Sequence, residues 1–235
     1  KQNSNAFSSI DLVLHPSSFI NNQEDWLTKR IYSINNISFC KGKLNGVEVI
    51  TNICGIGKVF AAMSSQLMIV KFAPSLIINI GAGGSLSSDI HITDIVIAVK
   101  TCQHDIDVSP IGFKRGEIVG PNKIWFDCDK NAVAVLDECA TQLHLKHHLA
   151  NIVTGDTFVN SNEQKQSITS QFDGQVCEME GSSIAQVCFT NNTPFVVIRA
   201  VSDEADCNAS TNFLSLVDKV IIDAINLLKL AIVKL

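Results

Sequence analysis

Two glutamates separated by a single residue are the first feature of the sequence that could do chemistry. Glu178 and Glu180 flank Met179 at the end of an apolar run and directly before Gly181. If that run is a strand, side-chain alternation sends both carboxylates to one side and the methionine to the other. Two like charges on one side repel each other, so solvent or specific partners must stabilise them. A solvated edge is the simpler interpretation, because most charged side chains lie on protein surfaces.

Apolar runs of strand length recur along the chain and alternate with stretches of helical pattern. The strand-like runs are residues 10–14, 47–51, 75–80, 94–99, 151–155 and 194–202. The helix-like stretches are residues 58–72, 129–143, 181–190 and 213–234. Several strand-like runs consist of Val and Ile without alternation, as in strands covered on both faces. This order predicts an α/β fold with three αβα layers, a central, mostly parallel twisted sheet, and one domain over residues 1–235.

The composition excludes several classes of protein. The chain has 235 residues, 46% of them hydrophobic, and a net charge of −5 without a basic run, so a nucleic-acid partner is not expected. Its apolar stretches are shorter than the roughly 18 residues that a membrane span requires, and no signal peptide is visible. Eight cysteines are scattered without a CxxC pair, which gives no support to a zinc site. We expect a cytoplasmic protein with reduced, buried cysteines, although the even number leaves disulfides open.

Four polar segments follow the strand-like runs. They are GAGGS (81–85), GDTFVN (155–160), EMEG (178–181) and SDEAD (202–206). In sheets of this kind, ligands bind beyond the carboxyl ends of the strands, so the four segments together predict a binding site. The glycines at 81, 83 and 84 would let the backbone approach a ligand closely, although a tight turn between strand and helix would need them as well.

Six segments of the sequence resemble a known family in their order and spacing. They are ICGIGKVFAA, INIGAGGSL, QHDIDVSPIGFKRGEIVG, TGDTFVN, VCEMEGSSIAQVC and PFVVIRAVSDEAD. Over residues 42–230 the chain is similar to the purine nucleoside phosphorylase/uridine phosphorylase superfamily, and most similar to its 5′-methylthioadenosine/S-adenosylhomocysteine nucleosidases. The resemblance implies a phosphorylase/hydrolase-like fold and hydrolysis of the N-glycosidic bond of a purine nucleoside, with release of adenine. It also implies a place in methionine salvage, and neither a cofactor nor a metal.

The resemblance assigns roles to the acidic residues. Glu180 would bind the ribose hydroxyls and stabilise positive charge on the sugar, and it would stay ionised because those hydroxyls donate hydrogen bonds to it. Met179 would pack against the nucleoside, with Glu178 just behind. Asp203 would protonate N7 of the purine, which requires a raised pKa. This division suits a dissociative glycosidic transition state, which needs a proton on the base and a carboxylate near the sugar.

Further contacts are implied around these carboxylates. Arg199 and Ser202 resemble supporting residues, although an arginine in a buried strand would need a partner for stability alone. Phe158 would stack on the adenine, Val159 would contact it through its backbone, and Gly84 would make a backbone contact.

The segment that carries Ile111 and Phe113 resembles a loop lent by a neighbouring subunit to the alkylthio pocket. That resemblance implies a homodimer. The alternative is that both side chains simply anchor an ordinary loop.

The N-terminal segment departs from the family. The nucleosidases have a glutamate after their first strand that activates the attacking water, and ungapped alignment places Ser17 or Ser18 there. Glu24 and Asp25 follow later and could be brought back by a different loop path. His15 could serve as a base on the strength of its pKa, although a lone histidine after a strand is more often an ordinary polar residue.

The glycine segment departs as well, because Ala82 stands where the family usually has a serine; it is still an expected substrate contact. Arg30 is unassigned, and no clear equivalent of the phosphate-binding arginines of the phosphorylases is evident. Three interpretations remain: a nucleosidase with a relocated or weakened water activator, a phosphorylase, or a non-catalytic nucleoside-binding protein. The intact pair of Glu180 and Asp203 favours an enzyme.

Overall fold

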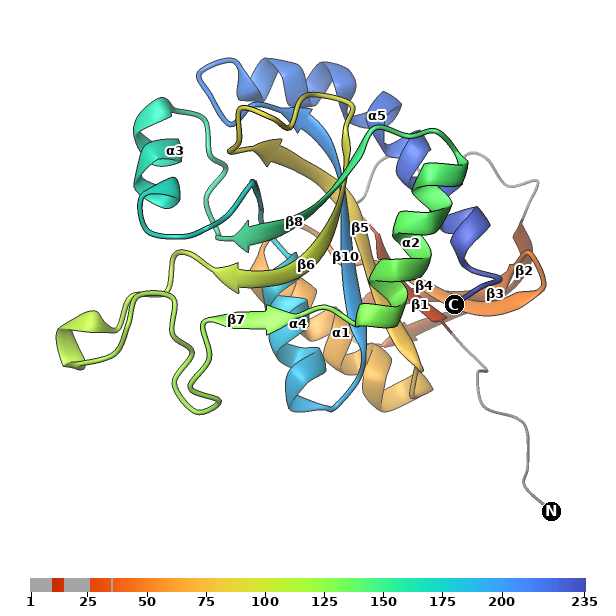
Figure 1. Cartoon of the computed structure of the whole chain (residues 1–235). Helices are drawn as coiled ribbons and strands as arrows, with labels where there is room; N and C mark the ends of the chain where they lie inside the picture. Colours follow the sequence, from red (N-terminus) through yellow and green to blue (C-terminus); the bar gives the residue numbers. More distant parts are fainter. Residues whose placement is uncertain (1–9, 15–25, 35) are drawn as a thin grey trace.

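The computed structural model describes residues 10–14, 26–34 and 36–235. Its strands are β1 (Ile10–Leu14), β2 (Trp26–Ile34), β3 (Ile37–Leu44), β4 (Val47–Ile53), β5 (Leu76–Ser85), β6 (Ile95–Gln103), β7 (Trp125–Asp127), β8 (His147–Thr154), β9 (Val176–Glu178) and β10 (Phe195–Asp203). Its helices are α1 (Lys58–Phe72), α2 (Lys130–Gln142), α3 (Asn162–Thr169), α4 (Gly181–Thr190), α5 (Ala209–Ala231) and the short 3₁₀ helix η1 (Ser109–Ile111). Figure 1 shows these elements as a central sheet with helices around it.

The strands form one sheet that closes partly on itself. β5 pairs with β9 and β10, and the ring is completed through β8 and β6. The remaining strands β1, β4, β3 and β2 extend from the first half of β5, where β1 pairs with residues 76–80. Helix α1 packs against α4, and α2 packs against α5. The expected α/β class, with a central sheet flanked by helices, is confirmed.

The sheet is more mixed than expected. Five of the described strand pairings are parallel and five are antiparallel, so a mostly parallel sheet is a wrong prediction. Part of the reason is the β2–β3–β4 meander, in which Asn45 and Gly46 form the tight turn between β3 and β4 with positive φ angles.

The predicted helices are present with small shifts at their ends. Asp129 caps α2 by accepting a hydrogen bond from the backbone N–H of Ala132. Helix α1 ends where expected, and α5 begins at Ala209 rather than at Phe213. Helix α3 was not predicted, because its sequence is polar and Ile168 alone is buried, so it has no apolar pattern of helical spacing.

The glycine segment is not a loop. Residues 81–85 belong to β5, and none of the three glycines there has a positive φ. The interpretation as a tight turn is therefore wrong, and close approach is the reason for the glycines. A Cβ on Gly83 would lie 2.7 Å from Cγ1 of Val176, and a Cβ on Gly84 would lie 2.6 Å from Oδ1 of Asp203.

All eight cysteines are free, and six of them are buried, as expected of small apolar side chains. None of the helices in the described ranges is long and apolar enough to span a membrane.

We expect Gly83→Ala to lower the free energy of unfolding by about 1–3 kcal/mol, because the new methyl group overpacks against Val176. Urea denaturation of Gly83→Ala, Val176→Ala and the double variant measures the coupling between the two sites. The loss caused by Gly83→Ala should be smaller in the Val176→Ala background. Equal losses in both backgrounds would contradict the close contact.

Candidate active site

A pocket opens where β5, β9 and β10 end. Its empty space, counted together with the part open to solvent, is about 600 Å³, within the range of small-molecule sites. Its lining consists of Ile56, Ala82, Gly83, Gly84, Thr157, Phe158, Val159, Cys177, Glu178, Met179, Glu180, Ser202, Asp203 and Phe213. All four segments predicted to form a site contribute to it.

Glu178 is buried and fully hydrogen-bonded. Its Oε2 accepts hydrogen bonds from the backbone N–H groups of Glu180 (2.9 Å) and Gly181 (2.7 Å) and from the guanidinium of Arg199. Its Oε1 accepts from the hydroxyl of Thr154. Such pairing offsets the cost of removing this carboxylate from water, so the solvated edge is a wrong interpretation.

Arg199 lies behind the pocket rather than in its lining. Its side chain is 1% exposed, and Nη2 donates to Glu178 and to Oδ1 of Asn79 at 2.6 Å. Nη2 also lies 3.8 Å from Oε2 of Glu180. This position favours the structural interpretation of the arginine, because its contacts are to protein groups.

Glu180 sits at a junction rather than on a strand. β9 ends at Glu178 and α4 begins at Gly181, so Glu180 is the N-cap residue of α4, and the expected strand alternation is wrong. Its Oε1 accepts a hydrogen bond from the backbone N–H of Gly57 at 2.9 Å. Burial, and then the charge of Glu178, raise the pKa of Glu180 to about 7, while Arg199 and Gly57 act in the opposite direction. Its charge therefore changes near neutral pH.

Asp203 is the second pocket carboxyl group with a raised pKa. Burial raises its pKa, although the Ala205 N–H at 2.9 Å from Oδ1 and the Ser202 hydroxyl at 2.8 Å from Oδ2 favour the charged form. The expected raised pKa is therefore confirmed in direction. The same contacts orient the carboxyl group at the end of β10.

Aromatic and apolar groups cover the remaining wall. Phe158 meets Phe213 edge-to-face, with ring centroids 5.7 Å apart. Val159 is buried beside it, and Met179 lines the pocket between the two glutamates. These side chains could enclose a flat, mostly apolar ligand.

Ile111 and Phe113 do not line this pocket. They lie in and just after η1, within the yellow-green segment that projects from the body between β6 and β7 in Figure 1. Ile111 is 73% exposed.

The pocket also contains residues that sequence reasoning missed. Ile56, Thr157 and Phe213 line it without having been assigned a role. Gly57 was missed as well, although the ICGIGKVFAA segment that contains it was recognised. Its contact is made by a backbone N–H group, which the side-chain pattern does not reveal.

The residues considered as water activators, His15, Ser17, Ser18, Glu24 and Asp25, lie outside the described residues. The last described residue before them, Leu14, pairs with Ile53 of β4 and Ile80 of β5.

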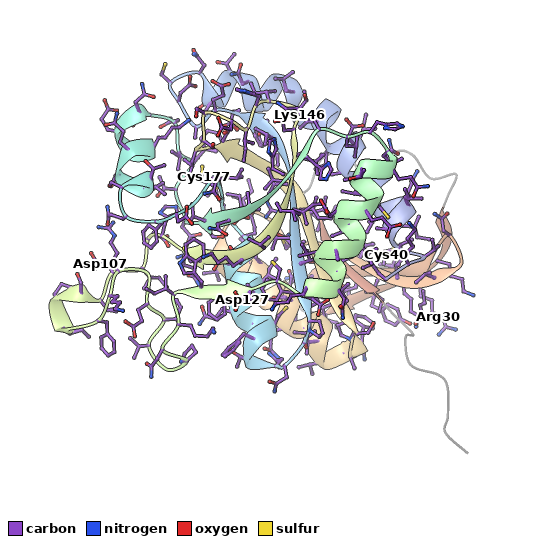
Figure 2. The ribbon with its side chains drawn as sticks, viewed as in Figure 1. Arg30, Cys40, Asp107, Asp127, Lys146 and Cys177 are labelled. Carbon is purple, nitrogen blue, oxygen red and sulfur yellow. The ribbon has the colours of Figure 1, made fainter. Side chains whose placement is uncertain are left out.

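Arg30 is far from the pocket. It is exposed on β2, and Figure 2 shows it across the molecule from Cys177, which lines the pocket.

Known proteins resemble this chain in sequence and in structure. A family model described as the phosphorylase superfamily matches residues 23–233. The 5′-methylthioadenosine/S-adenosylhomocysteine nucleosidase of Buchnera aphidicola subsp. Acyrthosiphon pisum (strain APS) is 37% identical over 205 residues, which cover 85% of this chain and 88% of that protein. The nucleosidase of the same description from Staphylococcus carnosus (strain TM300) is 36% identical over 183 residues, or 77% and 79% of the two chains.

Two solved structures extend the comparison. The S-adenosylhomocysteine nucleosidase from Streptococcus pyogenes, in complex with 5-methylthiotubericidin, has a TM-score of 0.93 at 26% identity and covers 99% of both chains. Futalosine hydrolase of Helicobacter pylori has a TM-score of 0.89 at 27% identity, covering 97% of this chain and 98% of its own.

The raised pKa of Glu180 predicts a stability that depends on pH. Between pH of about 4.5 and about 7, the unfolded chain releases this proton while the folded protein keeps it, so stability falls as the pH rises through this window. Glu180→Gln removes the ionisation. We therefore expect the difference in free energy of unfolding between variant and parent to shift in favour of the variant by about 1–3 kcal/mol from pH 5 to pH 8. Urea unfolding of both proteins at pH 5 and pH 8 measures this shift. The same difference between variant and parent at both pH values would contradict the raised pKa of Glu180.

Proposed function

Because the chain belongs to the phosphorylase superfamily and its relatives of 36–37% identity are 5′-methylthioadenosine/S-adenosylhomocysteine nucleosidases, we propose that it is an N-glycosidic nucleoside hydrolase. It cleaves 5′-methylthioadenosine- or S-adenosylhomocysteine-type nucleosides and releases adenine. One observation carries this proposal: two carboxyl groups with raised pKa, Glu180 and Asp203, line a single pocket beside an aromatic wall.

The reaction divides between these two groups. Protonated Asp203 gives its proton to N7 of the purine, and the bond between the base nitrogen and C1′ of the sugar breaks so that the adenine leaves as a neutral base. The electron pair of that bond goes to the base, and the positive charge that develops on the sugar is stabilised by ionised Glu180. Water then adds to C1′ and loses a proton to the solvent, from which Asp203 takes up a proton again.

Substrate binding and the charge of Glu180 are linked. Burial and the charge of Glu178 oppose the ionisation of Glu180 and raise its pKa to about 7. Ribose hydroxyls that donate hydrogen bonds to this carboxylate favour its charged form. A nucleoside therefore ionises Glu180 as it binds, which provides the negative charge where the transition state needs it.

The remaining pocket residues bind the nucleoside. Phe158 stacks on the adenine and Val159 contacts it through its backbone, while Ala82 and Gly84 contribute from β5. Met179 packs against the nucleoside. Ser202 orients Asp203 through the hydrogen bond to Oδ2.

Water is a better nucleophile than phosphate for this site. The chain has three arginines, of which Arg30 is remote, Arg115 is near Asp107 at the surface, and Arg199 is committed to Glu178. An anion would therefore have no free guanidinium to bind in the described pocket. The residue that activates the water is unassigned, and Ser18, Glu24 and His15 remain predictions.

We also propose that the protein is a homodimer. The projecting Ile111 and Phe113 would complete the alkylthio end of a partner's pocket, and Val59, Phe60 and Met63 give α1 an exposed apolar face that could join the two subunits. The single domain, the place in methionine salvage and the cytoplasmic location also remain predictions.

Incubation of the protein with 5′-methylthioadenosine, with and without phosphate, tests the proposed function. We expect free adenine and 5-methylthioribose at the same rate in both samples. Adenine together with a sugar 1-phosphate, formed only with phosphate, would identify a phosphorylase. Binding without any adenine release would contradict an enzyme.

We expect Asp203→Asn to reduce adenine release by about 10²–10⁴-fold, because an amide fills the same space but cannot deliver the proton. Binding of an unreactive adenosine analogue, measured by calorimetry, should change little. Asp89→Asn, in an exposed turn, is the control. Near-normal release by Asp203→Asn would remove this residue from the role.

A further inference from the structure

Helix α3 buries little of its own surface. Its buried residue is Ile168, and the rest of its sequence is polar. The helix follows directly after the pocket segment 155–160, which carries Phe158 and Val159, and its N-terminus is capped by Ser161. Hydrophobic burial alone is therefore a weak reason for its position, and polar contacts must contribute.

The strongest of those contacts comes from Lys165. Its Nζ donates to the backbone carbonyl of Ser85 at 2.8 Å and to that of Glu204 at 2.8 Å. Ser85 is the last residue of β5, and Glu204 follows the last residue of β10. One ammonium group thus joins the ends of the two parallel strands that form the floor of the pocket.

Each of these two carbonyls belongs to the residue that follows a pocket residue, Gly84 or Asp203. Ser85 follows Gly84, and Glu204 follows Asp203. Gly84 leaves just enough room for Asp203, because a Cβ there would lie 2.6 Å from Oδ1. Holding the two strand ends together therefore fixes the distance between Asp203 and the pocket wall.

Among the described residues, the positive charge of Lys165 is not neutralised by a neighbouring carboxylate, unlike the charges of Lys58 and Lys146. In the described part of the chain it forms no ion pair with a carboxylate, so its positive charge acts on the groups around it. The charged and titratable groups around Asp203 are Lys165 of α3, Asp206 and Cys177 of β9. Lys165 is the cation among these three.

We propose that Lys165 is a positioning residue for Asp203: it clamps the ends of β5 and β10 and supplies the positive charge that balances the buried acid. The inference rests on the proposed function, in which Asp203 is the proton donor. Because α3 continues from the segment that holds Phe158, the clamp also links the adenine wall to the acid.

The charge has a definite consequence. Burial and Asp206 raise the pKa of Asp203, and Lys165 lowers it. A general acid works best when its pKa is near the working pH, because a much weaker acid releases its proton poorly. Removing the charge should raise the pKa of Asp203 further, and removing the hydrogen bonds should loosen its position.

Three substitutions separate these effects. Lys165→Met removes both the charge and the donors, Lys165→Gln keeps donors without the charge, and Lys165→Arg keeps both. Gln166→Met, exposed on the same helix, is the matched control. Circular dichroism and thermal unfolding establish that each variant is folded.

The first measurement does not need activity. Carboxyl ¹³C NMR of the free protein, with Asp203 assigned by the Asp203→Asn spectrum, follows the titration of this group. We expect the pKa of Asp203 to rise in Lys165→Met and Lys165→Gln, and to stay at the parental value in Lys165→Arg and Gln166→Met. An unchanged titration in Lys165→Met would overturn the electrostatic part of the proposal.

The second measurement is the pH profile of kcat/KM for adenine release. We expect Lys165→Met to lower kcat/KM at neutral pH by about 10-fold or more, because small displacements of a catalytic group reduce the rate strongly. Its alkaline limb should move to higher pH, and Lys165→Arg should recover most of the rate. If kcat/KM of Lys165→Met and its pH profile matched those of Gln166→Met, the proposed positioning role of Lys165 would be wrong. An inactive parent protein would contradict the proposed function while leaving the NMR test of Lys165 intact.

Discussion

The buried ion pair between Arg199 and Glu178 is the interaction on which the rest of the site depends. It joins β10 to β9, and through Asn79 it also joins β5, so that three strands of the ring are fixed at one point. Two backbone N–H groups and the Thr154 hydroxyl complete the hydrogen bonds of the carboxylate. Such a pair adds little net stability, because both charges lose their water, but removing one partner typically costs about 3–5 kcal/mol. The pair therefore makes the arrangement specific: any displacement of β9 or β10 would leave a charge buried and unpaired.

This arrangement gives three neighbouring carboxyl groups three different environments. Glu178 forms an ion pair with the guanidinium of Arg199. Glu180 is farther from the same guanidinium, and burial and the charge of Glu178 raise its pKa to about 7. Asp203 is at the end of β10, where burial raises its pKa while Ser202 and Ala205 orient it. Carboxyl groups whose environments differ in this way can act as acid and as stabilising anion in one pocket at one pH.

The sequence was informative where local pattern and local structure agree. The long apolar runs, and helix α2 with its cap Asp129, are where they were expected, because burial and capping act locally. The pocket segments were also identified, because EMEG and SDEAD are unusual sequences at the ends of apolar runs. Tertiary contacts decided the rest. β5 continues through its glycines because Val176 and Asp203 pack against them, and Glu180 leaves the strand because Glu178 accepts the N–H groups that begin α4. Helix α3 has no apolar stripe that a pattern could detect, and Gly57 acts through its backbone.

We propose that the pocket binds a nucleoside in one orientation, with the base at Asp203 and the sugar at Glu180. The geometry of a bound ligand tests this orientation most directly. A crystal structure with an unreactive 5′-methylthioadenosine analogue that retains N7 and both ribose hydroxyls should place N7 within hydrogen-bonding distance of Asp203 and the hydroxyls on Glu180, with the base against Phe158. A ligand bound in the opposite orientation, with its hydroxyls on Asp203, would contradict the account.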